Sequence, residues 1–447
     1  MLLRSPELRQ ELRANLRLAL PIIATQITFV GMGTVDTIVA GRYGPGALAG
    51  VSVGTNVWFL MFVIFSGVLM ACSPIIAQRV GAARDPQETG SFVRATAVFA
   101  LVLGLLWFTI MQLAVTPVLA LMKLSEPAHG YAVQYMRAIA WAALPSCLCF
   151  LGRNVAEGHG LPRVALLAGV VGFTINAVLA VALTYGRFGF PQIGPVGCAW
   201  ATVIATTAMV AVYALRYTRE PRLQALQVFR RGWPQWHGEG WEVLRLGLPI
   251  AAILAAESWM FNIGALLMGR FGAHVVAAHQ VAINFAALSF MVPLAIGYAT
   301  TVRVGMAVGS GDRGAVRLRG QAGILLGVGY STISASVMAL LPALIVLAYT
   351  NEADVAEIAI HFLYFAAVFQ IVDCIQATAN GALRGIKDTR VPFLLTFLAY
   401  WIIGMPLAVW LAFATRQGPY GVWWGFIVAL AIAAVGLSSR FLRKTAI

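Results

Sequence analysis

The sequence predicts an all-α polytopic membrane protein, with twelve transmembrane helices arranged as two six-helix bundles in a parallel 6+6 repeat. Hydrophobic residues make up 60% of the 447 residues, charged residues make up only 11%, and the mean hydropathy is +0.82. Apolar runs repeatedly reach the roughly 20 residues that span a hydrocarbon core. In lipid, only helices and closed β-barrels satisfy all the backbone hydrogen-bonding groups. The alternating pattern of a membrane β-barrel is missing here, so we expect helices. The first half of the chain also recurs in the second.

Twelve apolar segments are long enough to be spans. In chain order they cover roughly residues 16–41, 50–76, 92–116, 131–152, 164–186, 195–217, 243–268, 276–302, 320–347, 357–383, 392–414 and 420–439. The charged N-terminal segment runs directly into a full-length span, so we expect no cleaved signal peptide.

The basic residues are distributed unequally between the two sides of these spans. With both termini inside, 25 of the 31 Lys and Arg lie in inner segments, and the outer side holds only Arg42, Lys123, Arg137, Arg187, Arg270 and Arg416. The positive-inside rule therefore predicts a membrane protein with both termini on the inner side, N-in and C-in. Because the net charge of +14 is spread over seven inner segments, its expected partner is anionic lipid and not nucleic acid.

Several chemistries lack their motifs. The five cysteines are odd in number and lie in or beside apolar segments, so we expect no disulfide framework and no metal site among them. No Gly-x-x-x-x-Gly-Lys-Ser/Thr loop is present, which excludes ATP hydrolysis by this chain. An embedded enzyme would need a nucleophile, base or metal set at one depth. We find no such set and expect that the protein is not an enzyme and has no cofactor.

Four motifs recur in the same order, which indicates a duplicated half. They are Arg17-Leu-Ala-Leu-Pro21-Ile with Arg245-Leu-Gly-Leu-Pro249-Ile, Gly41-Arg-Tyr-Gly44 with Gly269-Arg-Phe-Gly272, Arg79-Val-Gly81 with Arg303-Val-Gly305, and Gly194-Pro-x-Gly-x-x-Trp200 with Gly418-Pro-x-Gly-x-x-Trp424. Six spans per half give both copies one membrane orientation. The predicted bundles are residues 1–217 and 243–447, joined by a cytoplasmic linker over 218–242. In transporters such repeats place a binding site near the midplane and support alternating access.

Three carboxylates lie inside predicted spans, where ionised groups are costly and usually functional. At about 1.5 Å per residue, Glu257 lies roughly 18 Å from Arg245 and Asp373 roughly 16 Å from Arg384, so both are expected at one level near the midplane. No basic residue is expected beside them. Asp36 lies about 9 Å from Arg42 at the outer boundary, so it is expected apart from the other two, with Arg42 as an alternative partner.

Amides inside the spans have two interpretations. Asn176 either belongs to a polar site or links two helices. The same alternatives hold for the possible cavity-lining amides Gln280, Asn284, Gln370 and Gln376. His279 is interpreted as a structural group near a helix end.

The chain resembles the multidrug and toxic compound extrusion (MATE) family, in its bacterial NorM-type branch, over nearly its whole length. The likeness rests on Val35-Asp36-Thr37 with Gly41-Arg-Tyr-Gly44, Glu257-Ser258, Ala277-Ala-His279-Gln-Val-Ala-Ile-Asn284 through Thr301-Val-Arg303-Val-Gly305, and Gln370-x-x-Asp373-x-x-Gln376 through Gly381-Ala-Leu-Arg-Gly385-x-Lys387-Asp-Thr389. The resemblance implies a secondary active exporter that exchanges bulky, often cationic drugs for Na⁺ or H⁺.

The residues that the resemblance carries over are Asp36, Asn176, Glu257 and Asp373. One departure is Ala180, where NorM-type proteins commonly have an amide or acid one turn after the span 5 asparagine. This residue counts against a fully formed polar site in the N-terminal half. The coupling ion stays open: oxygen ligands at Glu257 and Asp373 suit Na⁺, and carboxylates in an apolar cavity suit H⁺.

Two other functions remain as alternatives. A lipid-linked precursor flippase of the same superfamily needs a basic central cavity, whereas this chain places acids at mid-depth. A membrane-embedded enzyme lacks its catalytic set. We expect a monomer whose partners are small organic cations and membrane lipid.

Overall fold

The computed structural model of the protein describes residues 6–122, 124–229 and 238–446. Within these ranges it contains helices and no strands, and twelve helical segments are long and apolar enough to cross a membrane. The predicted fold class is thereby confirmed. Residues 230–237 of the predicted linker, and the basic residues Arg4, Lys123, Arg230 and Arg231, lie outside the described residues.

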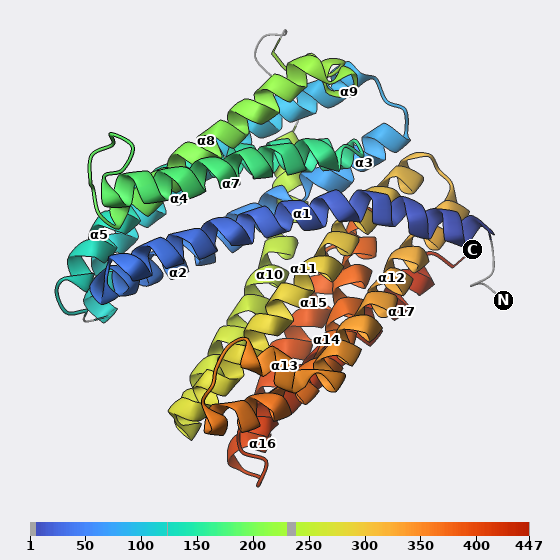
Figure 1. Ribbon diagram of the computed structural model, residues 1–447. Helices are drawn as coiled ribbons and strands as arrows, with labels where there is room; N and C mark the ends of the chain where they lie inside the picture. Colours follow the sequence, from blue (N-terminus) through green and yellow to red (C-terminus); the bar gives the residue numbers. More distant parts are fainter. Residues whose placement is uncertain (1–5, 123, 230–237, 447) are drawn as a thin grey trace. The chain divides into compact units, whose positions relative to one another are not determined.

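Eight spans are single helices (Figure 1): α1 (Pro6–Tyr43), α4 (Pro86–Met122), α7 (Pro162–Tyr185), α8 (Val196–Arg219), α11 (Ala273–Gly309), α12 (Arg313–Leu340), α14 (Ala353–Gly385) and α17 (Pro419–Lys444). The other four spans are interrupted. They are α2 (Pro45–Leu69) with α3 (Cys72–Gly81), α5 (Ala128–Ile139) with η2 (Ala140–Ala142) and α6 (Ala143–Gly158), α10 (Glu239–Met268) with η3 (Gly269–Phe271), and α15 (Arg390–Phe397) with the π-helical η4 (Leu398–Gly404) and α16 (Met405–Phe413). Two short helices, α9 (Pro221–Gln224) and α13 (Pro342–Leu347), complete the described chain.

Two of the four repeated sequence motifs lie at turns, where their glycines are required. Gly194 and Gly418 have φ values of 68° and 56°, a left-handed conformation that favours glycine. A proline follows each of them, at the start of α8 and of α17, where its missing N–H costs no helical hydrogen bond. Gly272, at the corner between α10 and α11, has a φ of 105°. These two motifs therefore recur because both copies need the same turns.

The described chain forms two compact units, which are treated separately below. The first comprises Met1–Leu20 with Ala252–Ile447, and the second comprises Pro21–Ala251. The beginning of α1 thus belongs with the C-terminal half. The bundle limits predicted from the repeat, 1–217 and 243–447, stay a prediction.

Small residues allow close helix packing in the second unit. A Cβ atom on Gly172 of α7 would lie 2.5 Å from Sδ of Met209 in α8, and one on Gly54 of α2 would lie 2.4 Å from the ring of Tyr135 in α5. Without water to drive apolar association, helices in lipid depend on such van der Waals contact. The five cysteines are all buried, and none forms a disulfide.

The first unit packs in the same way around α14. A Cβ on Gly381 of α14 would lie 2.3 Å from the backbone oxygen of Gly297 in α11. Toward the other end of α14 the core is aromatic, with the rings of Phe362 and Trp423 at a centroid distance of 5.9 Å. These contacts hold α11 and α17 against α14, the helix that carries Asp373.

Candidate functional site

The first unit brings Glu257 of α10 and Asp373 of α14 together. Asp373 is buried at 3% exposure and Glu257 is partly buried. The two carboxylates are electrostatic neighbours, and their charges interact directly. Two like charges in an apolar interior repel strongly, so the pair favours a state in which a cation is shared or one acid is protonated.

Arg384 corrects the expectation that no basic residue reaches this pair. It is buried at 5% exposure near the end of α14, and its charge interacts with that of Glu257. Its guanidinium carbon also lies 5.8 Å from the ring centroid of Tyr298. The sequence could place Arg384 relative to Asp373, because both lie on one helix and the rise per residue separates them. It could not place Arg384 relative to Glu257, which lies on another helix, because that distance depends on how the two helices pack. Glu257 therefore has a basic neighbour.

Buried oxygens accompany Asp373 on α14. Oδ1 of Asp373 and Oε1 of Gln370 are buried and accept no hydrogen bond from the described residues. Gln370 lies one helical turn before Asp373, and its amide nitrogen lies 3.5 Å from Sγ of Cys374. Carboxylate and amide oxygens are ligands that hard cations prefer. The donor set therefore fits a hard cation such as Na⁺.

Tyr400 is a neighbour of the pair that the sequence did not reveal. It is fully buried in η4, and its hydroxyl oxygen accepts a hydrogen bond from Nε2 of Gln376 at 2.9 Å. It is also an electrostatic neighbour of both Glu257 and Asp373. Since the amide donates to the phenol oxygen, the phenol hydrogen is free to be donated elsewhere. A π-helical turn is frequent at functional sites, but periodicity alone does not show where one falls.

The second unit holds a separate polar cluster around Asp36. Nδ2 of Asn176 lies 3.3 Å from Oδ1 of Asp36, and Oγ1 of Thr202 donates to Oδ2 at 3.1 Å. The asparagine and the threonine are also linked, at 3.1 Å. Asp36 is buried at 6% exposure and Asn176 completely. The carboxylate thus faces the interior of its unit, and the structure joins Asp36 with Asn176.

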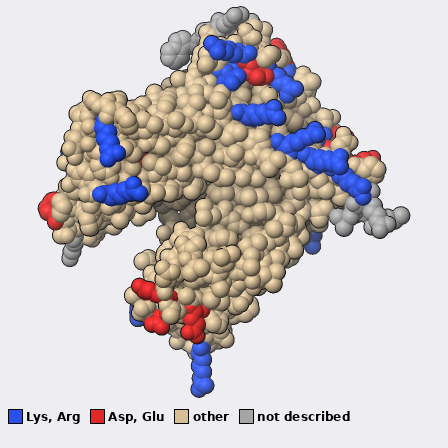
Figure 2. All heavy atoms as spheres, viewed as in Figure 1, with Lys and Arg blue, Asp and Glu red and all other residues tan. Residues whose placement is uncertain are grey.

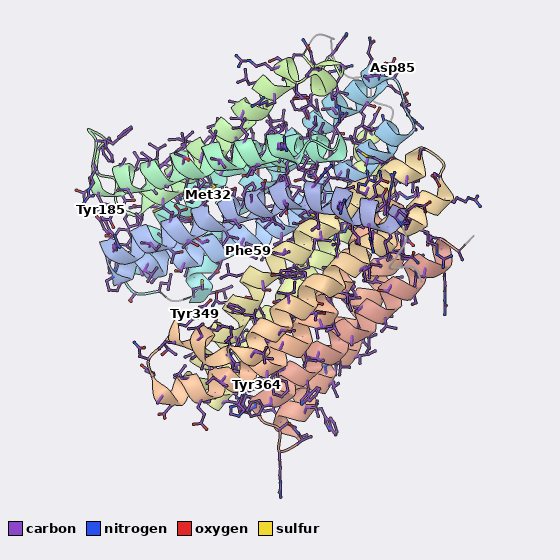
Figure 3. All side chains as sticks on the ribbon, turned by 45° about the vertical axis from the view of Figure 1, so that its right-hand side comes forward. Met32, Phe59, Asp85, Tyr185, Tyr349 and Tyr364 are labelled. Atoms are coloured by element: carbon purple, nitrogen blue, oxygen red, sulfur yellow. The ribbon has the colours of Figure 1, made fainter. Side chains whose placement is uncertain are left out.

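Asp36 lies toward one end of the second unit. Tyr185, the last residue of α7, donates to the backbone oxygen of Val39, one turn after Asp36, at 2.9 Å. In Figure 3, Tyr185 and Asp85 mark opposite ends of this unit, and Met32 lies between them. Arg42 is exposed, and no ion pair joins it to Asp36 in the described part of the chain. The alternative partner suggested by the sequence is therefore not used.

Thr202 takes part in the cluster at a position that sequence reasoning missed. Ala180, the position where the sequence departs from the NorM-type pattern, is fully buried and carries no polar group. Thr202 of α8 provides a donor to Asp36 instead. The only signal for Thr202 in the sequence was its place two residues after Trp200 of the repeated motif. Its residue type gave no signal, because Thr206 and Thr207 in the same span are threonines too.

The remaining predicted amides lie elsewhere. Gln280 and Asn284 are exposed on α11, where Nδ2 of Asn284 donates to the backbone oxygen of Gln280 at 2.7 Å. Asn56 is exposed on α2 and was missed, although it precedes Asn284 by the spacing that separates Pro21 from Pro249. His279 is buried, and its ring centroid lies 5.4 Å from that of Trp423. The residues described here include no group of three or more His, Cys, Asp or Glu side chains suited to a metal ion.

Comparisons with known proteins agree with this architecture. The MatE family model matches the chain twice, at residues 21–182 and 249–410, so the same profile fits both halves. The multidrug resistance protein PmpM of Pseudomonas aeruginosa is 38% identical over 99% of this chain and 93% of its own length. A probable multidrug resistance protein NorM of Xanthomonas campestris pv. campestris is 37% identical over 99% of this chain and 96% of its own length.

Solved structures share the fold. The outward-facing conformation of a multidrug resistance MATE family transporter superposes with a TM-score of 0.89 at 21% identity, over 99% of this chain and 97% of the other. The eukaryotic MATE transporter AtDTX14 gives a TM-score of 0.84 at 19% identity, over 98% of this chain and 99% of the other.

Proposed function

The chain belongs to the multidrug and toxic compound extrusion (MATE) family, and we propose that it exports bulky, mostly cationic organic compounds in exchange for Na⁺ or H⁺. It acts as a secondary active antiporter by alternating access. It works as a monomer in a bacterial inner membrane, with both termini inside. It needs no ATP and no resident cofactor.

The interacting pair Glu257 and Asp373 carries this proposal. Two carboxylates buried together in apolar helices are stable only when their charge is partly neutralised. A proton, a metal cation or an organic cation each supplies that neutralisation. Such a site binds any one of these cations, but a second cation adds little binding free energy once the first has neutralised the pair. Binding of one cation is therefore coupled to release of the other.

The surroundings of the pair allow either coupling ion. The unpartnered oxygens of Asp373 and Gln370 support direct coordination of Na⁺. Tyr400 and Gln376 support a proton instead, because a hydroxyl and an amide can orient a neutral carboxyl group. Asp36, with Asn176 and Thr202, forms a second cation-sensitive group in the other unit. We assign it to coupling or to drug exit, separate from the Glu257 pair.

The surroundings of the pair favour export of cations over the alternative of a lipid-linked precursor flippase. A pyrophosphate group would need several basic side chains. Among the described residues, one buried arginine, Arg384, lies beside the acid pair, and it already interacts with Glu257. The net charge of this group is therefore negative when both acids are ionised.

Transport in proteoliposomes with independently imposed Na⁺ and pH gradients tests the proposal. We expect Glu257→Gln and Asp373→Asn each to reduce gradient-driven drug efflux at least tenfold, to the level of empty vesicles. Glu357→Gln provides the matched control, because Glu357 is an exposed acid on the same helix α14. Its efflux should match the unmodified protein. Full transport rates in both site variants, with either gradient, would rule out the coupling assignment.

A further inference from the structure

One face of the beginning of α1 carries a row of arginines that the transport proposal does not use. Arg9, Arg13 and Arg17 follow one another at intervals of four residues, and all three are exposed. Side chains four apart lie one above another along a helix, so the row extends about 12 Å. Figure 2 shows a row of basic side chains where Figure 1 places this end of α1.

The opposite face of the same segment is held in the first unit. Glu11 forms ion pairs with Arg303 of α11 and Arg319 of α12. Nδ2 of Asn15 donates to Oγ1 of Thr300 at 2.9 Å. These contacts fix the rotation of the helix about its axis. The arginine row therefore points outward, and Glu11 is already engaged on the other side.

The charge of the row is uncompensated. No ion pair joins Arg9, Arg13 or Arg17 to any carboxylate in the described residues, and like charges four residues apart repel one another. With Pro6, Gln10 and Ala14 these arginines line a shallow, open hollow along one face of α1. Guanidinium groups bind phosphate through paired hydrogen bonds as well as charge. The arginine row is thus complementary to a phosphate group.

The same face continues into aliphatic side chains. Leu16 and Leu20 are 39% and 61% exposed, and helical geometry points them within about 20° of the direction of Arg9. A ligand on this face meets positive charge at one end and apolar surface at the other. A free phosphate ion would use only the charged end, whereas a phospholipid would use both.

We propose that the row of Arg9, Arg13 and Arg17 is a binding site for the phosphodiester headgroup of an anionic phospholipid, with the acyl chains along Leu16 and Leu20. Each basic residue near an anionic membrane surface strengthens binding by about fivefold. The proposed lipid site lies on α1, the helix that also carries Asp36.

Native mass spectrometry of the full-length protein in a neutral maltoside tests the site, with dioctanoyl phosphatidylglycerol as the probe and dioctanoyl phosphatidylcholine as the neutral comparison. We expect Arg13→Gln to weaken phosphatidylglycerol binding about fivefold. The triple variant R9Q/R13Q/R17Q should weaken it about a hundredfold, whereas R9K/R13K/R17K keeps the charge but loses the paired hydrogen bonds and should weaken it less. The matched control is R163Q/R219Q/R443Q, which removes three exposed arginines from three separate helices. It should change the affinity less than twofold. Thermal unfolding without lipid checks that each variant is folded.

Three outcomes would overturn the proposal. Unchanged phosphatidylglycerol binding in both R13Q and R9Q/R13Q/R17Q would show that lipid binds elsewhere. An equal loss in R163Q/R219Q/R443Q would show an effect of net charge only. Displacement of the lipid by glycerol phosphate at equal concentration would show a site for a free phosphate compound, without a contribution from the apolar face.

Discussion

Glu257 and Asp373 have different neighbours, and the difference predicts unequal effects on stability. Removing the charge of Glu257 leaves the buried Arg384 without the acid whose charge it interacts with, whereas removing the charge of Asp373 relieves repulsion. We expect Glu257→Gln to cost on the order of 1–3 kcal/mol of unfolding free energy, and Asp373→Asn to leave stability unchanged or higher. Melting temperatures in detergent provide the measurement. The double variant E257Q/R384Q should recover part of the loss, and equal melting temperatures for the two single variants would contradict the assignment of Arg384.

Thr202 is expected to act only through Asp36. Thr202→Val removes the donor to Oδ2 of Asp36, so drug efflux driven by a pH gradient should fall severalfold. Thr206→Val is the matched control, because the Thr206 hydroxyl bonds to carbonyls of its own helix, at 2.8 Å and 3.0 Å. Efflux rates in a double-mutant cycle with Asp36→Asn give the decisive comparison. If Thr202→Val still lowers efflux when Asp36 is already neutral, the threonine acts independently.

At single positions, the sequence identified the charged residues of the sites but not the uncharged side chains that contact them. Asp36, Glu257 and Asp373 stand out because ionised residues are rare in apolar spans. Thr202 and Tyr400 do not stand out, since hydroxyl and aromatic residues are ordinary there. Whether such a side chain reaches an acid depends on helix rotation and, at Tyr400, on a π-helical turn that changes the helical phase. Neither property can be read from composition.

At the scale of helices, glycine contacts between α11 and α14 set how closely the two elements pack. A methyl group on Gly381 would meet the backbone oxygen of Gly297 at 2.3 Å, and a backbone atom cannot yield without separating the helices. We expect Gly381→Ala to destabilise the protein by about 1–3 kcal/mol. Gly329→Ala on α12 is the control, because nothing lies within 4 Å of its added Cβ.

Thermal unfolding in detergent distinguishes these two glycine positions. Gly329→Ala should be neutral or slightly stabilising, as alanine is the better helix former. A melting temperature of Gly381→Ala equal to that of the unmodified protein would mean that the α11–α14 contact relaxes at no cost.

The twelve spans themselves were predictable from length and hydropathy. Their interruptions at Met70, at Ala140–Ala142 and in η4 were not, because they arise from packing within continuous apolar runs.

Across the whole molecule, duplication preserved contacts while the chemistry at them diverged. The repeat places Gly264 opposite Asp36 and Phe426 opposite Thr202. A Cβ on Gly264 would lie 2.1 Å from the ring of Phe426, so the site of the polar contact in one half is an aromatic contact in the other. One position of the repeat thus holds a carboxylate in the second unit and a glycine, without a side chain, in the first.

The position of Glu257 shows the converse. Its repeat equivalent is Phe29, which lies 5.7 Å below the guanidinium carbon of Arg153. Glu257 is an electrostatic neighbour of Arg384, and Arg153 and Arg384 come from the fourth and tenth spans, which correspond in the repeat. The four repeated motifs made the duplication predictable. They did not predict which half carries which charge, since the acids are not related by the repeat.

Separate acidic groups in the two units lead to a final prediction, that coupling ion and drug compete through the pair Glu257 and Asp373. An exchanger must not cycle empty, and a carboxylate pair neutralised by either cation, but not by both, prevents this. Binding of one then weakens the other by a reciprocal free energy of about 1–3 kcal/mol, or about 5- to 150-fold in affinity. Drug affinity in detergent should fall with rising Na⁺ at fixed pH, or with falling pH in the absence of Na⁺, because protonation removes the negative charge that attracts the drug. Asp373→Asn should flatten the response and Glu357→Gln should not. Flat curves for the unmodified protein in both titrations would exclude competition at this pair, and coupling would then fall to Asp36 with Asn176 in the other unit.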